Sequence, residues 1–297
     1  MKPLTPLESS PALAAAIGVK ALFLKREDLH PLGSHKGRSL PVMIERYRAA
    51  GDRRFALSSS GNAALAAALA VRGANAGQQA ADPLSLDIFV GVHAAPHKLE
   101  KLRALADGHI RVLVKERPLQ ALAQAVGGGM RSLRQSTDDA ALAGYGALAD
   151  ELAADPAMAR GAAVFIGTSS GTTAQALAAS FSGQSLPMQA HIVQVSSCHP
   201  MADAFESYDG PGERSIADAI TDITALRKPA LIPLIRKTGG SGWTVSDEAI
   251  RAAQEMAERH ASLSLSPNGA LPIAGAMRAA SSGFGLPDAV VCIVGGE

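Results

Sequence analysis

Strand-like segments alternate with helix-like segments along most of this 297-residue chain. Apolar runs at residues 86–92 and 110–114 are each followed by a stretch with apolar side chains at helical spacing. The same alternation returns after residue 150, with strand-like runs at 162–167 and 190–197. Parallel strands need a crossover connection, which is usually a helix. The pattern therefore predicts βαβ units and an α/β fold with mainly parallel, helix-flanked sheets.

The other expected elements fit this pattern. Further strands are expected at 21–25, at 289–296 and in the segment 53–61, which ends in a Ser/Gly turn. Helices are expected at 62–73, 97–107, 118–126, 149–158, from Thr172 onward, and at 245–260. Gly73 is expected to end the first of these helices, and Ser246 is the expected N-cap of the last. Aromatic residues are scarce, with 1 Trp, 3 Tyr and 7 Phe. Small side chains let helices pack closely on a sheet, which favours layered α/β architecture over an aromatic-rich sandwich.

The length predicts one large domain or two ordinary ones. Segments 127–130 and 134–140 read as loops and place a boundary near 127–147. No repeat with a period of 20–50 residues is present, which excludes a solenoid.

Charge and hydropathy exclude several classes of partner. The net charge is only +1, so the chain lacks the cationic excess that attracts nucleic acid. The longest apolar run, 63–71, is far too short to span a bilayer. Residues 11–19 resemble the apolar part of a signal peptide but lack its flanking features. Cys198 and Cys292 are too few for a disulfide framework, so a cytoplasmic protein is expected.

Three polar turns stand where a strand is expected to lead into a helix. They are 25–38, which contains Lys36, 57–62 with three serines and a glycine, and 166–173 with two glycines and five hydroxyl residues. Ligands of open parallel sheets bind at the carboxyl ends of strands. Backbone N–H groups and a helix dipole together favour an anion there. From the residues alone, each turn could equally serve only as a helix cap.

Other binding motifs are missing or incomplete. The 166–173 turn lacks the Gly-Lys-Ser/Thr ending of a nucleotide-binding P-loop and the GxGxxG pattern of dinucleotide folds. His93 and His97 have i, i+4 spacing, but Pro96 lies between them and no Glu follows His93. We therefore expect no metal site.

The order of four motifs resembles fold-type II pyridoxal-phosphate (PLP) enzymes, over nearly the whole chain. The motifs are KREDLHPLGSHKGR (25–38), SSSGN (58–62), GTSSGTT (167–173) and SPNGALPIAG (266–275). Within that family, segments 215–220 and 236–250 are most similar to threonine synthases and threonine dehydratases, whereas GTSSGTT is similar to the phosphate loop of cysteine synthases. The resemblance implies two α/β domains with PLP in the cleft between them. The larger would comprise 1–40 plus 151–297 and the smaller 41–150.

The resemblance also implies roles for individual residues. Lys36 would form the Schiff base with PLP and act as the catalytic acid and base. The cofactor phosphate would lie against Gly167, Thr168, Ser169, Ser170, Gly171 and Thr172. Asn62 would donate to the 3′-oxygen of the ring, and Ser59, Ser60 and Gly61 would receive the substrate carboxylate. A lysine becomes nucleophilic at neutral pH when burial or a nearby cation lowers its pKa.

The chain departs from the family near its last strand. Relatives place a Ser or Thr against the pyridine nitrogen, where this sequence has Gly295. Asn268, Ser266 or Glu297 could replace that partner, and Asn268 is the preferred candidate. A hydroxyl or amide keeps the ring nitrogen largely neutral, whereas a carboxylate favours its protonated form.

The expected function is a PLP-dependent amino-acid lyase or synthase that catalyses β- or γ-elimination or replacement. The nearest types are threonine synthase and threonine or serine dehydratase. The alternatives are a β-replacement enzyme similar to cysteine synthase and a PLP-binding protein with little catalysis. We expect a small amino-acid substrate, a homodimer, and neither a nucleic-acid nor a membrane partner.

Overall fold

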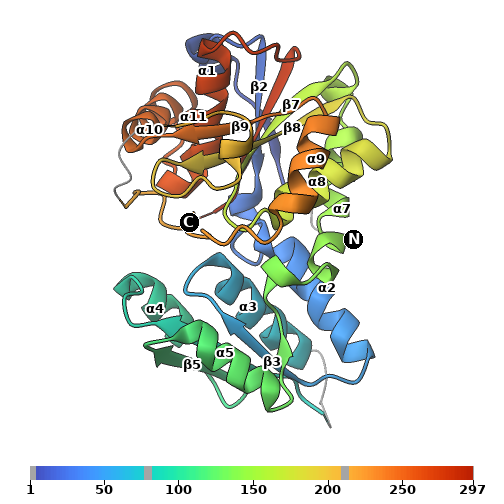
Figure 1. The fold of residues 1–297 in the computed structure, drawn as a ribbon, viewed down its shortest axis with the longest axis vertical. Coiled ribbons are helices and arrows are strands. Elements are labelled where there is room, and N and C mark those ends of the chain that lie inside the picture. The colour runs from blue at the N-terminus through green and yellow to red at the C-terminus, as the bar shows by residue number, and fades with distance from the viewer. Residues whose placement is uncertain (1–4, 77–81, 209–213, 297) are drawn as a thin grey trace. The chain divides into compact units, whose positions relative to one another are not determined.

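The structure is a computed structural model, which describes residues 5–76, 82–208 and 214–296. The chain forms two compact units (Figure 1): residues 1–30 with 145–297, and residues 31–144. Residues 31–40 thus belong with the smaller unit, because helix α2 (Lys36–Ala49) packs on α3 (Asn62–Ala76) there. Residues 145–150 belong with the larger unit, because α7 (Gly146–Ala153) packs in its core. The sequence-based boundaries at 40 and 150 differ from this division by these two segments.

The larger unit is built on a six-stranded sheet within its described residues, in the order β1-β2-β10-β7-β8-β9. The strands are β1 (Leu7–Ser9), β2 (Ala21–Arg26), β7 (Ala162–Gly167), β8 (Met188–Val195), β9 (Gly242–Val245) and β10 (Ala289–Val294). Only β1 runs antiparallel to its neighbour. The central strands are buried on both faces, as expected for parallel strands covered by helices.

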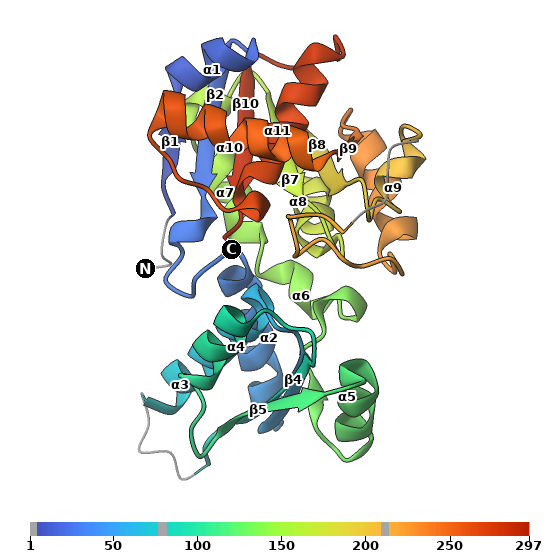
Figure 2. The same cartoon turned by 90° about the vertical axis from the view of Figure 1, so that its left-hand side faces the viewer.

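Two helical layers cover this sheet (Figures 1 and 2). One layer consists of α1 (Pro11–Ile17), α10 (Asp247–Ala261) and α11 (Pro267–Ser281). The other consists of α7, α8 (Thr172–Gly183) and α9 (Lys228–Lys237). Most of the segment 11–19, which resembles the apolar part of a signal peptide, forms α1, whose Leu13 and Ala14 are buried in the core.

The smaller unit has a four-stranded parallel sheet within its described residues, in the order β5-β4-β3-β6. The strands are β3 (Arg54–Ser58), β4 (Ser85–Gly91), β5 (Ile110–Lys115) and β6 (Arg131–Ser132). Figure 2 shows α2, α3 and α4 (Pro96–Arg103) on one face of the sheet and α5 (Pro118–Gly127) on the other. Along β3, Phe55 and Leu57 face α2 and α3, whereas Ala56 faces α5.

The remaining described elements are short. They are α6 (Ala140–Ala143) and the 3₁₀ turns η1 (Glu27–Leu29), η2 (Gln135–Thr137), η3 (Pro156–Met158) and η4 (Ala202–Ala204). Among the helices described, none is long and apolar enough to cross a membrane.

The α/β class with mainly parallel sheets is confirmed, and two local expectations are corrected. Helix α3 continues past Gly73 to Ala76, because the Asn75 amide then holds the chain by two 2.9 Å bonds to the backbone of Leu84. Lys36 is not in the middle of a loop. It begins α2, because Leu40 and Ile44 lie at helical spacing and bury their side chains against α3.

Candidate active site

Lys36 stands at the first position of α2 in the smaller unit and is partly buried. Its backbone N–H donates to Ser34 Oγ at 3.2 Å, which links it to the turn before the helix. Gly33 in that turn has φ +81°, and a Cβ built there would lie 2.8 Å from Leu65 Cδ2. Since Leu65 belongs to the first turn of α3, the segment that leads to Lys36 lies directly against the start of α3.

The hydroxyl turn 59–62 lies at that same place. It connects the carboxyl end of β3 to α3, whose first residue is Asn62. The Gly61 N–H donates to Ser59 Oγ at 3.3 Å, and Gly61 O accepts from the Leu65 N–H. The structure therefore brings two separate sequence motifs together within the smaller unit, one with Lys36 and one with hydroxyl groups at a helix N-terminus.

In the larger unit, the 167–172 loop joins β7 to the N-terminus of α8. Gly171 is the N-cap of α8 and has φ +82°. A Cβ at this position would lie 3.0 Å from Leu231 Cδ2 and 3.1 Å from Met201 Cε. Glycine is needed here both for its backbone conformation and for this close approach. The first turn of α8 is uncharged, so its N–H groups present only the positive end of the helix dipole.

The side chains of the loop are already engaged within the larger unit. Ser170 Oγ and Thr172 Oγ1 are 3.0 Å apart. Ser169 Oγ accepts from the backbone N–H groups of Thr221 and Asp222, at 3.1 and 3.3 Å. The backbone of the loop, rather than these hydroxyl groups, is therefore its main surface for an anion.

Residues 215–222 form a segment that we call the strap, and Ser169 binds its last two residues. Residues at the N-termini of two helices bind it as well. Asp247, at the start of α10, accepts from Ser215 Oγ at 2.6 Å and from the Ile216 N–H. At the start of α11, Asn268 Oδ1 accepts from the Ala219 N–H at 3.1 Å, and Asn268 Nδ2 donates to Asp218 Oδ1 at 3.0 Å. Sequence reasoning missed the strap, because its partners are far away in the chain.

Ser266 and the last described residues form one group near the end of β10. Ser266 Oγ accepts from the Gly269 N–H at 3.0 Å as the N-cap of α11, and it donates to the Gly296 carbonyl at 3.3 Å. Gly295 follows β10 directly. Glu297, the third candidate for the ring nitrogen, lies outside the described residues.

The geometry of each unit thus agrees with the family suggested by the motifs. Residues 3–296 match the sequence model of a family described as "Pyridoxal-phosphate dependent enzyme". The chain belongs to this family. PLP is therefore its cofactor, and the resemblance to fold-type II enzymes is confirmed.

This PLP enzyme is similar to a protein of named activity in sequence and to further proteins in structure. A threonine synthase from Methanosarcina acetivorans is 27% identical over 310 residues, which cover 99% of this chain and 74% of the relative. A serine racemase from maize has a TM-score of 0.78 at 22% identity, covering 99% of this chain and 88% of that one. A threonine deaminase from Solanum lycopersicum has a TM-score of 0.78 at 20% identity, covering 99% and 84%. These two structures share the fold.

The 167–172 loop fits the PLP phosphate. A phosphate needs several N–H donors and room for a close backbone approach, and a glycine-capped helix start supplies both. The Arg227 guanidinium, which is buried, donates at 3.0 Å to Oε1 of Gln175, in the first turn of α8, and adds positive charge near the loop. The donor set therefore suits a dianionic group.

Neither cysteine of the enzyme competes with Lys36 as a nucleophile. Burial, with a smaller effect from the Asp222 carboxylate, raises the pKa of the Cys198 thiol. Burial alone raises the pKa of the Cys292 thiol, which is fully enclosed in β10. Both remain protonated at neutral pH and are therefore unreactive.

In the described parts of the chain, no group of three or more His, Cys, Asp or Glu residues is arranged to hold a metal ion.

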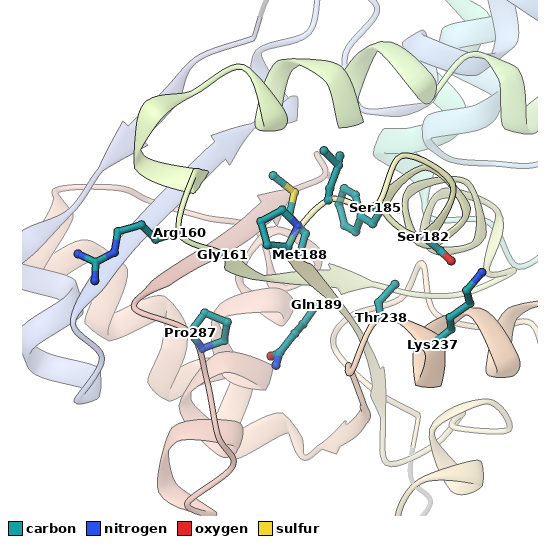
Figure 3. A pocket seen from close by; sticks show the side chains of 12 residues that line it. Arg160, Gly161, Ser182, Ser185, Met188, Gln189, Lys237, Thr238 and Pro287 are labelled. Atoms are coloured by element: carbon teal, nitrogen blue, oxygen red, sulfur yellow. The ribbon is translucent and has the colours of Figure 1, made fainter.

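A pocket of about 410 Å³ in the larger unit is a separate feature (Figure 3). It lies at the amino ends of the strands, where Gly161 precedes β7, Met188 begins β8 and Pro287 precedes β10. The ends of α8 and α9 that adjoin it, near Ser182 and Lys237, are carboxyl-terminal. Helix carboxyl ends disfavour an anion, so this pocket does not suit the cofactor phosphate.

Proposed function

We propose that this PLP enzyme is an amino-acid lyase or synthase that catalyses β- or γ-elimination or replacement. The threonine synthase relative, which covers nearly the whole chain, supports this reaction class. The observation that carries the proposal is the close approach of Gly33 to Leu65, because it brings the segment that leads to Lys36 against the first turn of α3, which follows the hydroxyl turn 59–62. A covalent lysine and a carboxylate-binding turn are the two groups that an α-amino acid must meet together.

Lys36 has two roles in this proposal. It would hold the cofactor through a covalent bond from its Nζ, and its amine would also move protons to and from the substrate. PLP, when bound, supplies the electron sink that makes loss of the substrate α-proton possible. Lys36 Nζ takes that proton, and as an ammonium it can donate one to the leaving group. The N-terminal position in α2 fixes the backbone from which the side chain extends.

The hydroxyl turn binds and orients the substrate. We assign the substrate carboxylate to Ser59, Ser60 and Gly61, where hydroxyl groups and the N-terminus of α3 both favour a negative charge. Asn62 would donate to the 3′-oxygen of the cofactor ring. The loop of Gly167, Thr168, Ser169, Ser170, Gly171 and Thr172 would hold the phosphate.

Asn268 is the proposed partner of the pyridine nitrogen. Its amide orientation is set by two bonds, since Oδ1 accepts from Ala219 and Nδ2 donates to Asp218. An amide nitrogen carries two hydrogens, so Nδ2 retains a second donor. Donation to a neutral ring nitrogen favours elimination or replacement, whereas a carboxylate there would hold a ring proton and favour racemisation. This is why we prefer a lyase or synthase over a racemase.

A substrate panel tests the proposal. The holoenzyme is mixed with L-serine, L-threonine, O-phosphohomoserine and O-acetylserine, and the cofactor spectrum and the products are recorded. We expect release of a 2-oxo acid and ammonia, of inorganic phosphate, or of acetate from one of these substrates. Conversion of L- to D-amino acid without loss of a substituent would show a racemase instead. Spectral change with no turnover would favour a PLP-binding protein.

The homodimer and the cytoplasmic location also stay predictions.

A further inference from the structure

Gln194 is a polar residue in the core of the larger unit. It lies on β8 between apolar neighbours, and its side chain is fully buried. A buried amide destabilises a fold unless hydrogen bonds satisfy it. A glutamine buried on an inner strand of the sheet therefore calls for a specific partner.

The hydrogen bonds of its side chain go to backbone groups around the phosphate loop. Gln194 Nε2 donates to the Thr168 carbonyl at 3.2 Å. Gln194 Oε1 accepts from the N–H groups of Met201 and Ala202, at 2.8 and 2.9 Å. One side chain thus joins the entry of the 167–172 loop to the segment that begins η4.

Both of these attachment points shape the loop. Thr168 is also fixed through its N–H, which donates to the Val193 carbonyl at 2.8 Å, and through its hydroxyl, which donates to the Ile166 carbonyl at 2.8 Å. Met201 supplies the surface beneath Gly171, since its Sδ would lie 3.2 Å from a Cβ at that position. Gln194 therefore fixes Thr168, the first residue after β7, and Met201, which packs against Gly171 at the start of α8.

We infer that Gln194 is a positioning residue for the cofactor phosphate, which it acts on through the loop and does not touch. The inference rests on the proposed role of the 167–172 loop. The amide suits this task because it supplies a donor and an acceptor without charge. A carboxylate at 194 would lack the N–H for Thr168 and would add a negative charge near a bound phosphate. A lysine could not accept from Met201 and Ala202.

The test compares PLP with pyridoxal, which has the same reactive aldehyde but no phosphate. Dissociation constants of both are measured by equilibrium dialysis for the wild type, Gln194→Met, and Gln189→Met. The control residue, Gln189, lies on the same strand, but its Oε1 pairs with His191 Nε2 instead of the loop. We expect Gln194→Met to weaken PLP by about tenfold or more, the order expected for lost buried hydrogen bonds. Pyridoxal affinity should change by less than about twofold for both variants, because neither residue acts on the aldehyde.

Three outcomes are decisive. If Gln194→Met keeps the wild-type preference for PLP over pyridoxal, Gln194 has no positioning role. If it weakens both compounds equally, its role is only structural, and the inference is wrong. If the wild type itself shows no preference for the phosphate ester, the proposed phosphate loop fails and the inference fails with it.

A second variant, Gln194→Glu, tests the inference if Gln194→Met does not fold. Gln194→Glu retains an acceptor for Met201 and Ala202 but cannot donate to Thr168. We expect a reduced phosphate preference together with a shifted ³¹P resonance of bound PLP, which a general loss of stability would not produce. An unchanged resonance and an unchanged preference would overturn the inference.

Discussion

A Cβ atom at Gly144 would lie 2.2 Å from the carbonyl oxygen of Arg38, in the first turn of α2. The chain between α6 and α7 therefore lies against the turn that begins with Lys36, and no side chain fits between them. Ser39 Oγ adds a 2.7 Å bond to the Ala141 carbonyl nearby. The position of Lys36 thus depends on a residue more than a hundred positions away in the sequence.

Gly144→Ala should displace the start of α2. The added methyl group meets backbone rather than a flexible side chain, so we expect a loss of about 1–3 kcal/mol in the free energy of unfolding. The fraction of PLP bound covalently should fall as well. Urea denaturation and the cofactor absorbance measure the two effects. Gly146→Ala is the matched control, because nothing lies within 4 Å of a Cβ there. Equal behaviour of the two variants would contradict this account.

Lys36→Ala should abolish covalent attachment of the cofactor while leaving part of the affinity for PLP. The 167–172 loop lies in the other unit and does not need Lys36 to form its N–H surface. Borohydride reduction followed by mass spectrometry should locate the pyridoxyl group on Lys36 in the wild type. A pyridoxyl group on Lys25, which instead pairs with Glu151 at 2.6 Å, or on Lys98 would refute the assignment.

Gly171→Val should weaken PLP binding by at least about tenfold, or roughly 1.4 kcal/mol. The φ of +82° is strained for valine, and its side chain would press on Leu231 and Met201. Dialysis of the holoenzyme, followed by absorbance, measures retention. Gly183→Val, at the other end of α8 with open space around its Cβ, should keep the cofactor. Normal retention by Gly171→Val would mean that the loop is only a helix cap.

Acid should destabilise the larger unit through His191. Burial lowers the pKa of His191 to about 3. Its ring stacks on Phe165 and accepts from Trp243 Nε1 at 3.1 Å, so the neutral form is built into the core. Because the pKa is lower in the folded state than in the unfolded state, this stability is complete well above pH 6.5 and falls as the pH drops from about 6.5 toward 3.

The expected loss from His191 between pH 8 and pH 5 is about 2 kcal/mol in the free energy of unfolding. Urea denaturation across this range measures it. His191→Gln lacks the titrating group, so its stability should be lower overall but should fall less steeply with acid. The same pH dependence in both proteins would assign the effect to other groups.

The sequence predicts the strands and the motifs well, because both depend on local patterns. Apolar runs such as 162–167 can only be buried strands or helices, and their short length decides between the two. The use of individual side chains is a different matter. Ser169 and Asn268 carry the signals of a phosphate loop and a helix start, yet both bind the strap, 49 to 53 residues away along the chain.

The role of Gln194 could not be predicted from the sequence either. In the run AHIVQVSS it reads as one polar interruption of a buried strand. Its role depends on hydrogen bonds to Thr168 and Met201, which come close to Gln194 only because β8 packs against its neighbours. Pairings between distant segments are set by the fold as a whole, so no local pattern reveals them.

Asn268→Asp should change the type of reaction rather than only its rate. The new carboxylate would lie beside Asp218, the present partner of Asn268 Nδ2 at 3.0 Å, and would replace the N–H donor that we propose for the ring nitrogen by an acceptor. An acceptor favours a protonated ring nitrogen, and we expect the ratio of racemised to eliminated product to rise by about tenfold or more, the change that corresponds to a shift of one unit in the pKa of that nitrogen. Chiral chromatography of the substrate, together with assay of the 2-oxo acid, measures that ratio.

Loss of the strap alone must be separated from this effect. Asp247→Asn weakens the hold on Ser215 and Ile216 without altering the group proposed to face the ring. It should lower turnover while leaving the product ratio unchanged. If Asp247→Asn and Asn268→Asp shift the ratio equally, Asn268 acts only by holding the strap. An unchanged ratio in Asn268→Asp, with an unchanged cofactor spectrum, would remove Asn268 from the ring nitrogen and leave a water or another group to serve it.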